Sequence, residues 1–164
     1  MQKFVIGMLV ANHSGVLTRI SGMFARRGFN IDSLTVGVTE IEGLSRMTVT
    51  MTGTDYERDQ MLKQLDKLYD VKEIKDITCS LAVTRELAII KVKASPENRL
   101  ELLTVANTFG AKVVDFSAEC ICVEKTGESN KLDAFIELLK PYGIVEMCRT
   151  GLVAIDRVSA TLKK

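Results

Sequence analysis

The chain has 164 residues, of which 46% are hydrophobic and 26% charged, and its 22 lysines and arginines nearly balance 21 aspartates and glutamates. A formal net charge of +1 excludes a strongly basic nucleic-acid-binding arm and a disordered acidic tail, because each needs a large excess of one sign. The length fits either one medium domain or two small ones.

The N-terminal segment predicts a cytoplasmic protein. A short apolar run follows Lys3 but stops at Asn12, and no small-residue cleavage site comes after it, which is unlike a secretory signal. No apolar stretch approaches the roughly 18–20 residues that cross a bilayer. We therefore expect a protein that contacts neither membrane nor nucleic acid.

A strand, a turn and a helix open the first half. Phe4–Ala11 is apolar at both alternating sets of positions, which predicts a strand covered by helices on one face and by a second chain or a partner protein on the other. Asn12–Gly15 supplies the turn. From Val16 the apolar spacing becomes helical, with Ser14 as the expected N-cap and Gly28 as the expected left-handed end.

A hairpin, a second helix and another strand follow. Ile31–Thr39 and Arg46–Thr52 are typical of two strands joined by a turn. Thr54 and Glu57 have the spacing of a capping box, which predicts a helix start, and Val71–Ile77 predicts the last strand. The order β-α-β-β-α-β places two helices on one face of a four-stranded antiparallel sheet, the ferredoxin-like arrangement of the α+β class.

The second half repeats this order. The helix-ending glycines Gly28 and Gly110 lie about half a chain apart, which indicates an internal repeat. We therefore expect two consecutive ferredoxin-like domains, residues 1–78 and 79–164. The elements expected in the second half are strands at Leu87–Val92, Val113–Phe116 and Glu119–Glu124, a helix that begins at Ser95 and Pro96, a helix that ends at Pro141, and a final strand within Ile144–Ile155.

The two halves differ in the turn that joins the first strand to the first helix. In Asn12–Leu17 a glycine lets a ligand approach the helix N-terminus, where unpaired N–H groups attract an anion. The corresponding Ala94–Arg99 contains Pro96 and Glu97, which remove a donor and add a negative charge. The N-terminal half is thus the expected small-anion site, and the C-terminal half a structural or docking copy.

Two amide side chains near this turn favour a zwitterion as the ligand. Asn12 in the turn and Asn30 after the helix can donate to a carboxylate and accept from an ammonium without adding net charge. Val16, Leu17 and Ile31 could shape a pocket for an aliphatic side chain. A free amino acid is therefore the expected ligand.

A purely structural interpretation of the same residues stays open. Ser14 could cap the helix, Gly15 could permit the turn, and Asn30 could take a left-handed conformation after Gly28. In that case the turn would bind nothing.

The four cysteines are not spaced as CxxC. We expect Cys79, Cys120, Cys122 and Cys148 to be buried free thiols in a reducing compartment. A metal site at the CxC pair is the alternative, but the one histidine, His13, lies far away in the sequence, so the chain lacks a zinc ligand set. We expect no metal or cofactor on this chain.

Three segments carry a family resemblance, namely Asn12–Ile20, Arg27–Val36 and Leu44–Thr48. They closely resemble the regulatory (small) subunits of acetolactate synthase, also called acetohydroxyacid synthase. The resemblance continues through Leu65–Val71 and Arg85–Val92, and it covers essentially the whole chain.

The resemblance implies an N-terminal ACT domain, a C-terminal ferredoxin-like domain, and a homodimer in which two ACT domains join their sheets side by side. In this family valine binds where the two ACT domains meet. His13 stands at a position that is acidic in some relatives, which bears on how the ammonium of the effector is balanced. Carried over by position, the valine site comprises Asn12, Gly15, Val16 and Leu17 of one chain and Asn30 and Ile31 of the other, with His13 and Ser14 as further candidates.

The resemblance also implies that the chemistry belongs to a separate catalytic (large) subunit. That subunit uses thiamine diphosphate, magnesium and FAD in branched-chain amino acid biosynthesis, and this chain would activate it and confer feedback inhibition by valine. The sequence itself contains no P-loop, no GxGxxG turn and no assignable Ser/His/Asp or Cys/His constellation. We therefore expect the chain to be non-catalytic.

Three other functions stay open. An ACT-domain sensor could respond to a different effector or partner enzyme. An RNA-binding module shares the β-α-β-β-α-β order, although Arg46–Thr52 lacks the stacking aromatics that such a module needs. A small phosphatase could use Asn12–Leu17 as an anion cradle together with Arg19.

Overall fold

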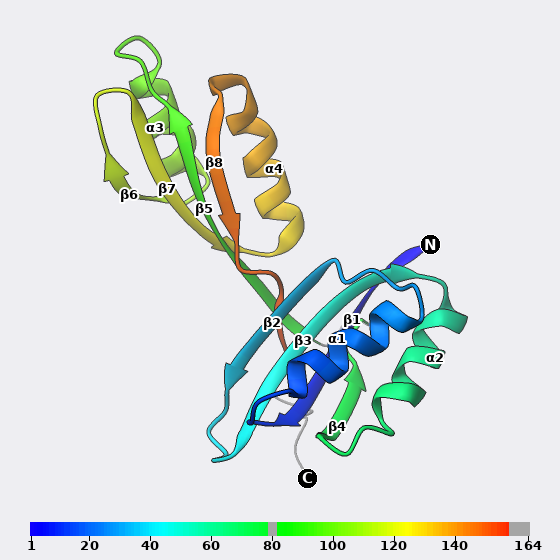
Figure 1. Cartoon of the computed structure of the whole chain (residues 1–164). Helices are drawn as coiled ribbons and strands as arrows, with labels where there is room; N and C mark the ends of the chain where they lie inside the picture. The colour runs from blue at the N-terminus through cyan, green and yellow to red at the C-terminus, as the bar shows by residue number, and fades with distance from the viewer. Residues whose placement is uncertain (79–81, 158–164) are drawn as a thin grey trace. The chain divides into compact units, whose positions relative to one another are not determined.

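The computed structural model describes residues 1–78 and 82–157 and divides the chain into two compact units (Figure 1). The N-terminal unit comprises Met1–Thr84 together with the segment from Leu152 onward, and the C-terminal unit comprises Arg85–Gly151. This grouping differs from the expected domains 1–78 and 79–164, because residues 152–157 pack with the N-terminal unit.

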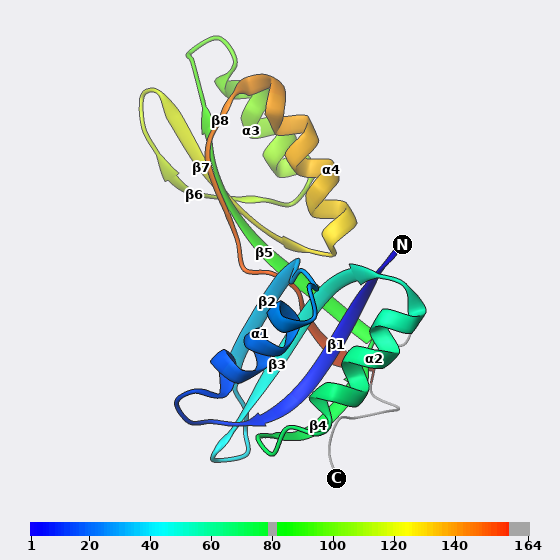
Figure 2. The ribbon, with the colours of Figure 1, turned by 45° about the vertical axis from the view of Figure 1, so that its right-hand side comes forward.

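The N-terminal unit has the predicted β-α-β-β-α-β order. Its strands form an antiparallel sheet in the order β2-β3-β1-β4, with both helices on one face (Figure 2). The elements in chain order are β1 (Gln2–Ala11), α1 (Val16–Arg26), β2 (Ser33–Val38), β3 (Leu44–Gly53), α2 (Asp55–Leu65) and β4 (Val71–Asp76).

The core of this unit lies between the sheet and the two helices. Successive side chains of a strand point to opposite faces of the sheet, so every second residue of β1 and β3 points toward the helices. These residues pack against Ile20 and Phe24 of α1. The capping box at the start of α2 is confirmed, since the Thr54 hydroxyl accepts from the Glu57 N–H and the Glu57 carboxylate accepts from the Thr54 N–H. The buried strand residues are Phe4, Ile6, Met8, Val10, Met47, Val49 and Met51.

The opposite face of the N-terminal sheet is covered by the chain itself. Leu9 of β1 packs with Ile77 and with Ala154 of β9 (Val153–Asp156), and all three are buried. Arg46 on β3 donates from Nε and Nη2 to the Ala154 carbonyl oxygen at 3.2 and 2.9 Å. The strand Phe4–Ala11 is therefore covered on both faces, as predicted, but the cover on the second face comes from the chain's own Ile77 and Ala154, where a second chain or a partner protein was expected.

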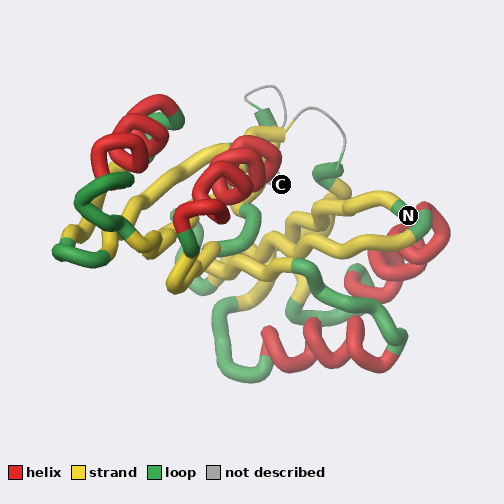
Figure 3. The backbone as a smooth tube through the Cα atoms, turned by 90° about the horizontal axis from the view of Figure 1, so that it is seen from above, coloured by secondary structure: helices red, strands yellow, loops and turns green. Residues whose placement is uncertain are grey.

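The C-terminal unit repeats the arrangement. Its sheet has the order β6-β7-β5-β8. Both of its helices lie on one face of the sheet, drawn red beside yellow strands in Figure 3. The elements are β5 (Ala82–Lys93), α3 (Arg99–Thr108), β6 (Lys112–Phe116), β7 (Cys120–Gly127), α4 (Ser129–Leu139), the 3-10 helix η1 (Lys140–Tyr142) and β8 (Ile144–Arg149).

Two predicted N-caps are wrong, although α1 begins at Val16 as expected. The N-cap of α1 is Gly15 rather than Ser14, and no side chain caps that helix. Helix α3 begins at Arg99 with Asn98 at its N-cap, so Ser95 and Pro96 lie in the preceding turn. In both cases the turn before the helix extends past the serine that was expected to cap it.

The last predicted strand is in fact two strands. Gly151, with a φ of 81°, separates β8 from β9, and this left-handed conformation interrupts the extended backbone.

The expectation of buried thiols is wrong for Cys148, which is exposed, whereas Cys120 and Cys122 are half-buried and all three are free. Cys79 lies outside the described residues.

Candidate functional site

The turn between β1 and α1 is fixed by backbone hydrogen bonds to two neighbouring segments. The Ala11 N–H donates to the Asp70 carbonyl and the Asn12 N–H to the Gly43 carbonyl, each at 2.8 Å. Gly15 has a φ of 88°, a conformation that a side chain would strain. The turn therefore has a defined shape in which its polar side chains face solvent.

The N-terminus of α1 is open toward the outside of the molecule. The helix has neither a side-chain cap nor an acidic residue in its first turn, so its first N–H groups keep their capacity to bind an anion. Asn12, His13, Ser14 and Gly15 are all exposed beside it. This arrangement is what a carboxylate or phosphate ligand would need.

A buried carboxylate contacts both this turn and helix α1. The Asp70 side chain is 4% exposed, and its two oxygens contact the His13 Nε2 at 3.0 Å and the Arg19 Nη1 at 2.5 Å. The His13 Nδ1 lies 3.0 Å from the Ser14 carbonyl oxygen. The Asp70 carboxylate thus connects the turn to the first helical turns of α1.

Asp70 is the residue that sequence reasoning missed. It lies more than fifty residues from the turn and precedes β4 in a short connection after Tyr69. The one signal that could have found it is the antiparallel pairing of β1 with β4, which brings the end of β1 beside the start of β4. The contact also occupies His13, so this ring is held against Asp70.

The hydrophobic residues expected around the ligand divide between the core and the surface. Val16 is 4% exposed and belongs to the core of the unit, whereas Leu17 is 47% exposed on the outer side of α1. Ile31 is half-buried and packs against the same core. Of these three residues, Leu17 is the one whose side chain is free to contact a ligand.

The second predicted segment lies at the other end of α1. Asn30 follows that helix, and its Nδ2 donates to the Asp32 Oδ1 at 3.2 Å. A helix of 11 residues is about 16 Å long, so Asn30 and the turn at Asn12 do not meet within one chain. A site that uses both segments therefore needs two chains.

The corresponding turn of the C-terminal unit is built differently. There the Asn98 side chain accepts from the Ser95 N–H at 2.8 Å, and Glu101 lies in the first turn of α3. An acidic residue at this position opposes the binding of an anion at the helix N-terminus. The two units thus differ in local chemistry where the sequence predicted that they would.

Neither a metal cluster nor a membrane helix is found in the described part of the chain. Within residues 1–78 and 82–157, no group of three or more His, Cys, Asp or Glu side chains is arranged to hold a metal ion. No helix in those ranges is long and apolar enough to span a bilayer.

Comparisons with known proteins place both units in one family. Residues 6–73 match the AHAS small subunit-like ACT domain, and residues 85–158 match the small subunit of acetolactate synthase. A probable acetolactate synthase small subunit of Archaeoglobus fulgidus is 48% identical over 155 residues, covering 94% of this chain and 97% of the relative.

Two further relatives have the same description. The acetolactate synthase small subunit of Bacillus subtilis is 49% identical over 156 residues, which is 94% of this chain and 91% of that one. The crystal structure of the acetolactate synthase small subunit from Thermotoga maritima superposes with a TM-score of 0.88 at 38% identity, covering 96% of this chain and 98% of that chain. The match therefore extends along the whole chain in sequence and in fold.

Proposed function

Because the chain belongs to the family of acetolactate synthase small subunits, we propose that it regulates a catalytic subunit of acetolactate synthase, activating it and making it sensitive to valine. The chain itself would be non-catalytic and cytoplasmic. Thiamine diphosphate, magnesium and FAD would reside on the catalytic partner, which carries out a step of branched-chain amino acid biosynthesis.

The observation that carries this proposal is the open N-terminus of α1 beside Asn12 and Gly15. A valine carboxylate would bind the free N–H groups of the first helical turn, where the helix dipole is favourable. The Asn12 amide can accept from the valine ammonium, and Leu17 offers an exposed aliphatic surface beside it. The proposed effector would thus be recognised at both charged ends.

The topology supports a homodimer through β2. This strand is an edge of the sheet, and its Val36 and Val38 are 43% and 80% exposed. An exposed edge with apolar side chains can pair with a second copy, and a two-fold axis would make that pairing antiparallel. Two ACT domains would then share one continuous sheet.

Such pairing would complete the effector site. The C-terminal end of β2 lies at the same end of the sheet as the turn between β1 and α1. The Thr39 N–H, just after β2, donates to the Leu44 carbonyl of β3, and Leu44 pairs with Ala11 at the end of β1. An antiparallel partner strand begins where this one ends, so the partner's Asn30, which precedes its β2, would approach this turn. The two segments that lie apart in one chain would meet across the dimer.

Feedback inhibition requires valine to bind two states of the complex unequally. A coupling free energy of about 1–3 kcal/mol between the valine site and the catalytic subunit is typical of such regulation. The proposal places that coupling at an interface between chains, where a ligand contacts two bodies that can move relative to each other.

Reconstitution with a catalytic subunit from the same source tests the proposal. We expect acetolactate formation to rise when the chain is added and to fall when valine is added. Asn12→Ala and Asn30→Ala should weaken the valine response by at least about tenfold while leaving activation intact, because each removes a polar contact to the effector.

Asn107→Ala is the matched control, since this exposed asparagine lies on α3 of the other unit. An unchanged valine response in both test variants would rule out the proposed site. Activation without any response to valine would favour the alternative of a different effector, which leucine and isoleucine would then identify in the same assay.

A further inference from the structure

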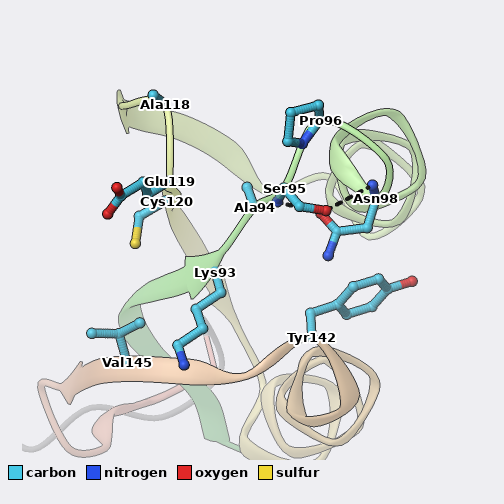
Figure 4. A pocket seen from close by; sticks show the side chains of 10 residues that line it. All are labelled: Lys93, Ala94, Ser95, Pro96, Asn98, Ala118, Glu119, Cys120, Tyr142 and Val145. Carbon is cyan, nitrogen blue, oxygen red and sulfur yellow. Dashed lines mark hydrogen bonds between the residues drawn. The ribbon is translucent and has the colours of Figure 1, made fainter.

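A pocket of about 700 Å³ opens in the C-terminal unit, at the end of the sheet where β5 turns toward α3. Three segments line it, namely the turn after β5, the turn before β7, and the chain from η1 into β8 (Figure 4). This volume lies within the range of small-molecule sites in proteins. All of its lining residues belong to the C-terminal unit.

The turn after β5 holds one amide donor ready for a ligand. The Ser95 N–H donates to the Asn98 Oδ1 at 2.8 Å, and the Asn98 N–H donates to the Ser95 Oγ at 3.4 Å. The Asn98 amide oxygen is therefore occupied, whereas its Nδ2 has no hydrogen-bond partner among the described residues. In Figure 4 this nitrogen points away from the turn and toward Tyr142.

Lys93 supplies an uncompensated positive charge to the same pocket. No carboxylate in the described part of the chain pairs with it, although Lys91, two residues earlier on β5, pairs with Glu146 at 2.8 Å. The hydrogen bond to Glu146 raises the pKa of Lys91. The Lys93 stem lies against Gly143, where a Cβ would stand 3.3 Å from the Lys93 Cδ.

The remaining walls are apolar with one acidic residue. The Tyr142 hydroxyl donates to Glu101 at 2.8 Å, and this hydrogen bond raises the pKa of Tyr142. Because the hydroxyl is occupied by Glu101, Tyr142 lines the pocket with its ring. Val145 adds an aliphatic surface. Glu119 has no ion-pair partner within the described ranges, and its negative charge opposes a dianion such as phosphate more strongly than a monocarboxylate.

We propose that this pocket binds a small monocarboxylate with a short aliphatic chain. The Lys93 ammonium would hold the carboxylate, since charge-assisted hydrogen bonds are the strongest that such a site can make. The Lys93 side chain runs toward Val145 in Figure 4, so it would turn toward the Asn98 Nδ2 for both groups to donate to the same carboxylate. Val145 and the Tyr142 ring would contact the aliphatic chain. If the ligand is an amino acid, Glu119 would accept from its ammonium. The site shares no residue with the proposed valine site.

Titration of the ¹⁵N-labelled full chain, followed by NMR, tests the proposal. The probes are valine, 2-oxoisovalerate, which has the same carbon skeleton without the ammonium, and inorganic phosphate. We expect at least one of the two carboxylates to shift the amide signals of Ser95, Asn98 and Glu119 saturably, and phosphate to leave them unchanged. Shifts confined to residues 12–17 and 30–31, equal shifts with phosphate, or no shifts at all would overturn the proposal.

A matched pair of lysine variants gives the second readout. Lys93→Met should weaken carboxylate binding at this pocket by at least about tenfold, whereas Lys91→Met, on the same strand but paired with Glu146, should not. Equal effects of the two substitutions would overturn the proposal. If valine binds more tightly than 2-oxoisovalerate, and Glu119→Gln removes this difference, the ligand is an amino acid. If 2-oxoisovalerate binds more tightly than valine, the ligand is an oxo acid. Either result supports the site.

Discussion

At the scale of single residues, the candidate site depends on a carboxylate that the ligand itself would not touch. Asp70 is buried and contacts His13 on the turn and Arg19 on the helix, so it fixes the geometry of both. Because the partners are half-exposed, solvent weakens the pairing, and the contribution to stability stays modest. The main effect of Asp70 is therefore on the shape of the turn.

We expect Asp70→Asn to loosen the turn and to lower stability by about 1–2 kcal/mol, since a neutral amide cannot balance the charge of the Arg19 guanidinium. In the reconstituted enzyme, the valine concentration for half-inhibition should rise several-fold while activation is retained. Asp66→Asn, at an exposed position after α2, is the control. Equal valine responses in the two variants would show that Asp70 does not position the site.

Part of this site was predictable from sequence and part was not. Asn12, Gly15 and Asn30 could be identified because glycine and amide side chains next to a helix have local meaning. Asp70 was missed, because its role comes from strand pairing between distant segments and has no local pattern. The family resemblance had already implied that Asn30 comes from the other chain, and the length of α1 explains why it cannot reach the turn of its own chain.

At the scale of elements, the local patterns predicted the order of helices and strands in both units. The capping box of α2 and the helix-ending glycines Gly28 and Gly110 were confirmed, because each signal acts within one turn of helix. The start of α3 was mispredicted, since Ser95 caps a tight turn instead of the helix. Such competition between a turn and a helix end depends on packing that the sequence does not display.

The outer face of β1 provides a test at this scale. A Cβ on Gly7 would stand 2.2 Å from the Ile77 Cδ1 and 3.2 Å from its Cγ1, and Ile77 is only 4% exposed. We expect Gly7→Ala to destabilise the N-terminal unit by about 1–3 kcal/mol through overpacking. Urea unfolding measures the effect.

The double variant identifies the cause. Ile77→Val removes the Cδ1 methyl, so it should recover part of the stability lost in Gly7→Ala, although it costs about 0.5–1.5 kcal/mol alone. Strictly additive losses in the double variant would show that the clash with Ile77 is not the source of the destabilisation.

At the scale of the whole molecule, the N-terminal unit is discontinuous in sequence. Strand β9 returns to cover the outer face of its sheet, where Lys75 pairs with Asp156 at 2.8 Å and Arg46 donates to the Ala154 carbonyl. Burial lowers the pKa of Arg46, and the nearby Asp156 opposes that change. The packing of β9 on the N-terminal sheet could not be predicted from the local sequence, because Val153–Asp156 is equally typical of a strand that continues β8.

Ending the chain after Gly151 should therefore destabilise the N-terminal unit while leaving the C-terminal one folded. Leu9 and Ile77 would lose the cover of Ala154, and Lys75 would lose its carboxylate partner. Hydrogen exchange should become faster at the amides of β1 and stay slow at those of β7. A chain that ends after Arg157 keeps β9 and is the control; equal exchange at β1 in the two truncated chains would contradict the expectation.

The discontinuity also bears on how the protein folds during synthesis. The ribosome makes residues 1–84 long before it makes Val153–Asp156, so the first sheet can form while it still exposes its outer face. The N-terminal unit, although translated first, is completed last. A nascent chain held on the ribosome just short of β9 would present the apolar surface of Leu9 and Ile77 to chaperones, and release would bury it.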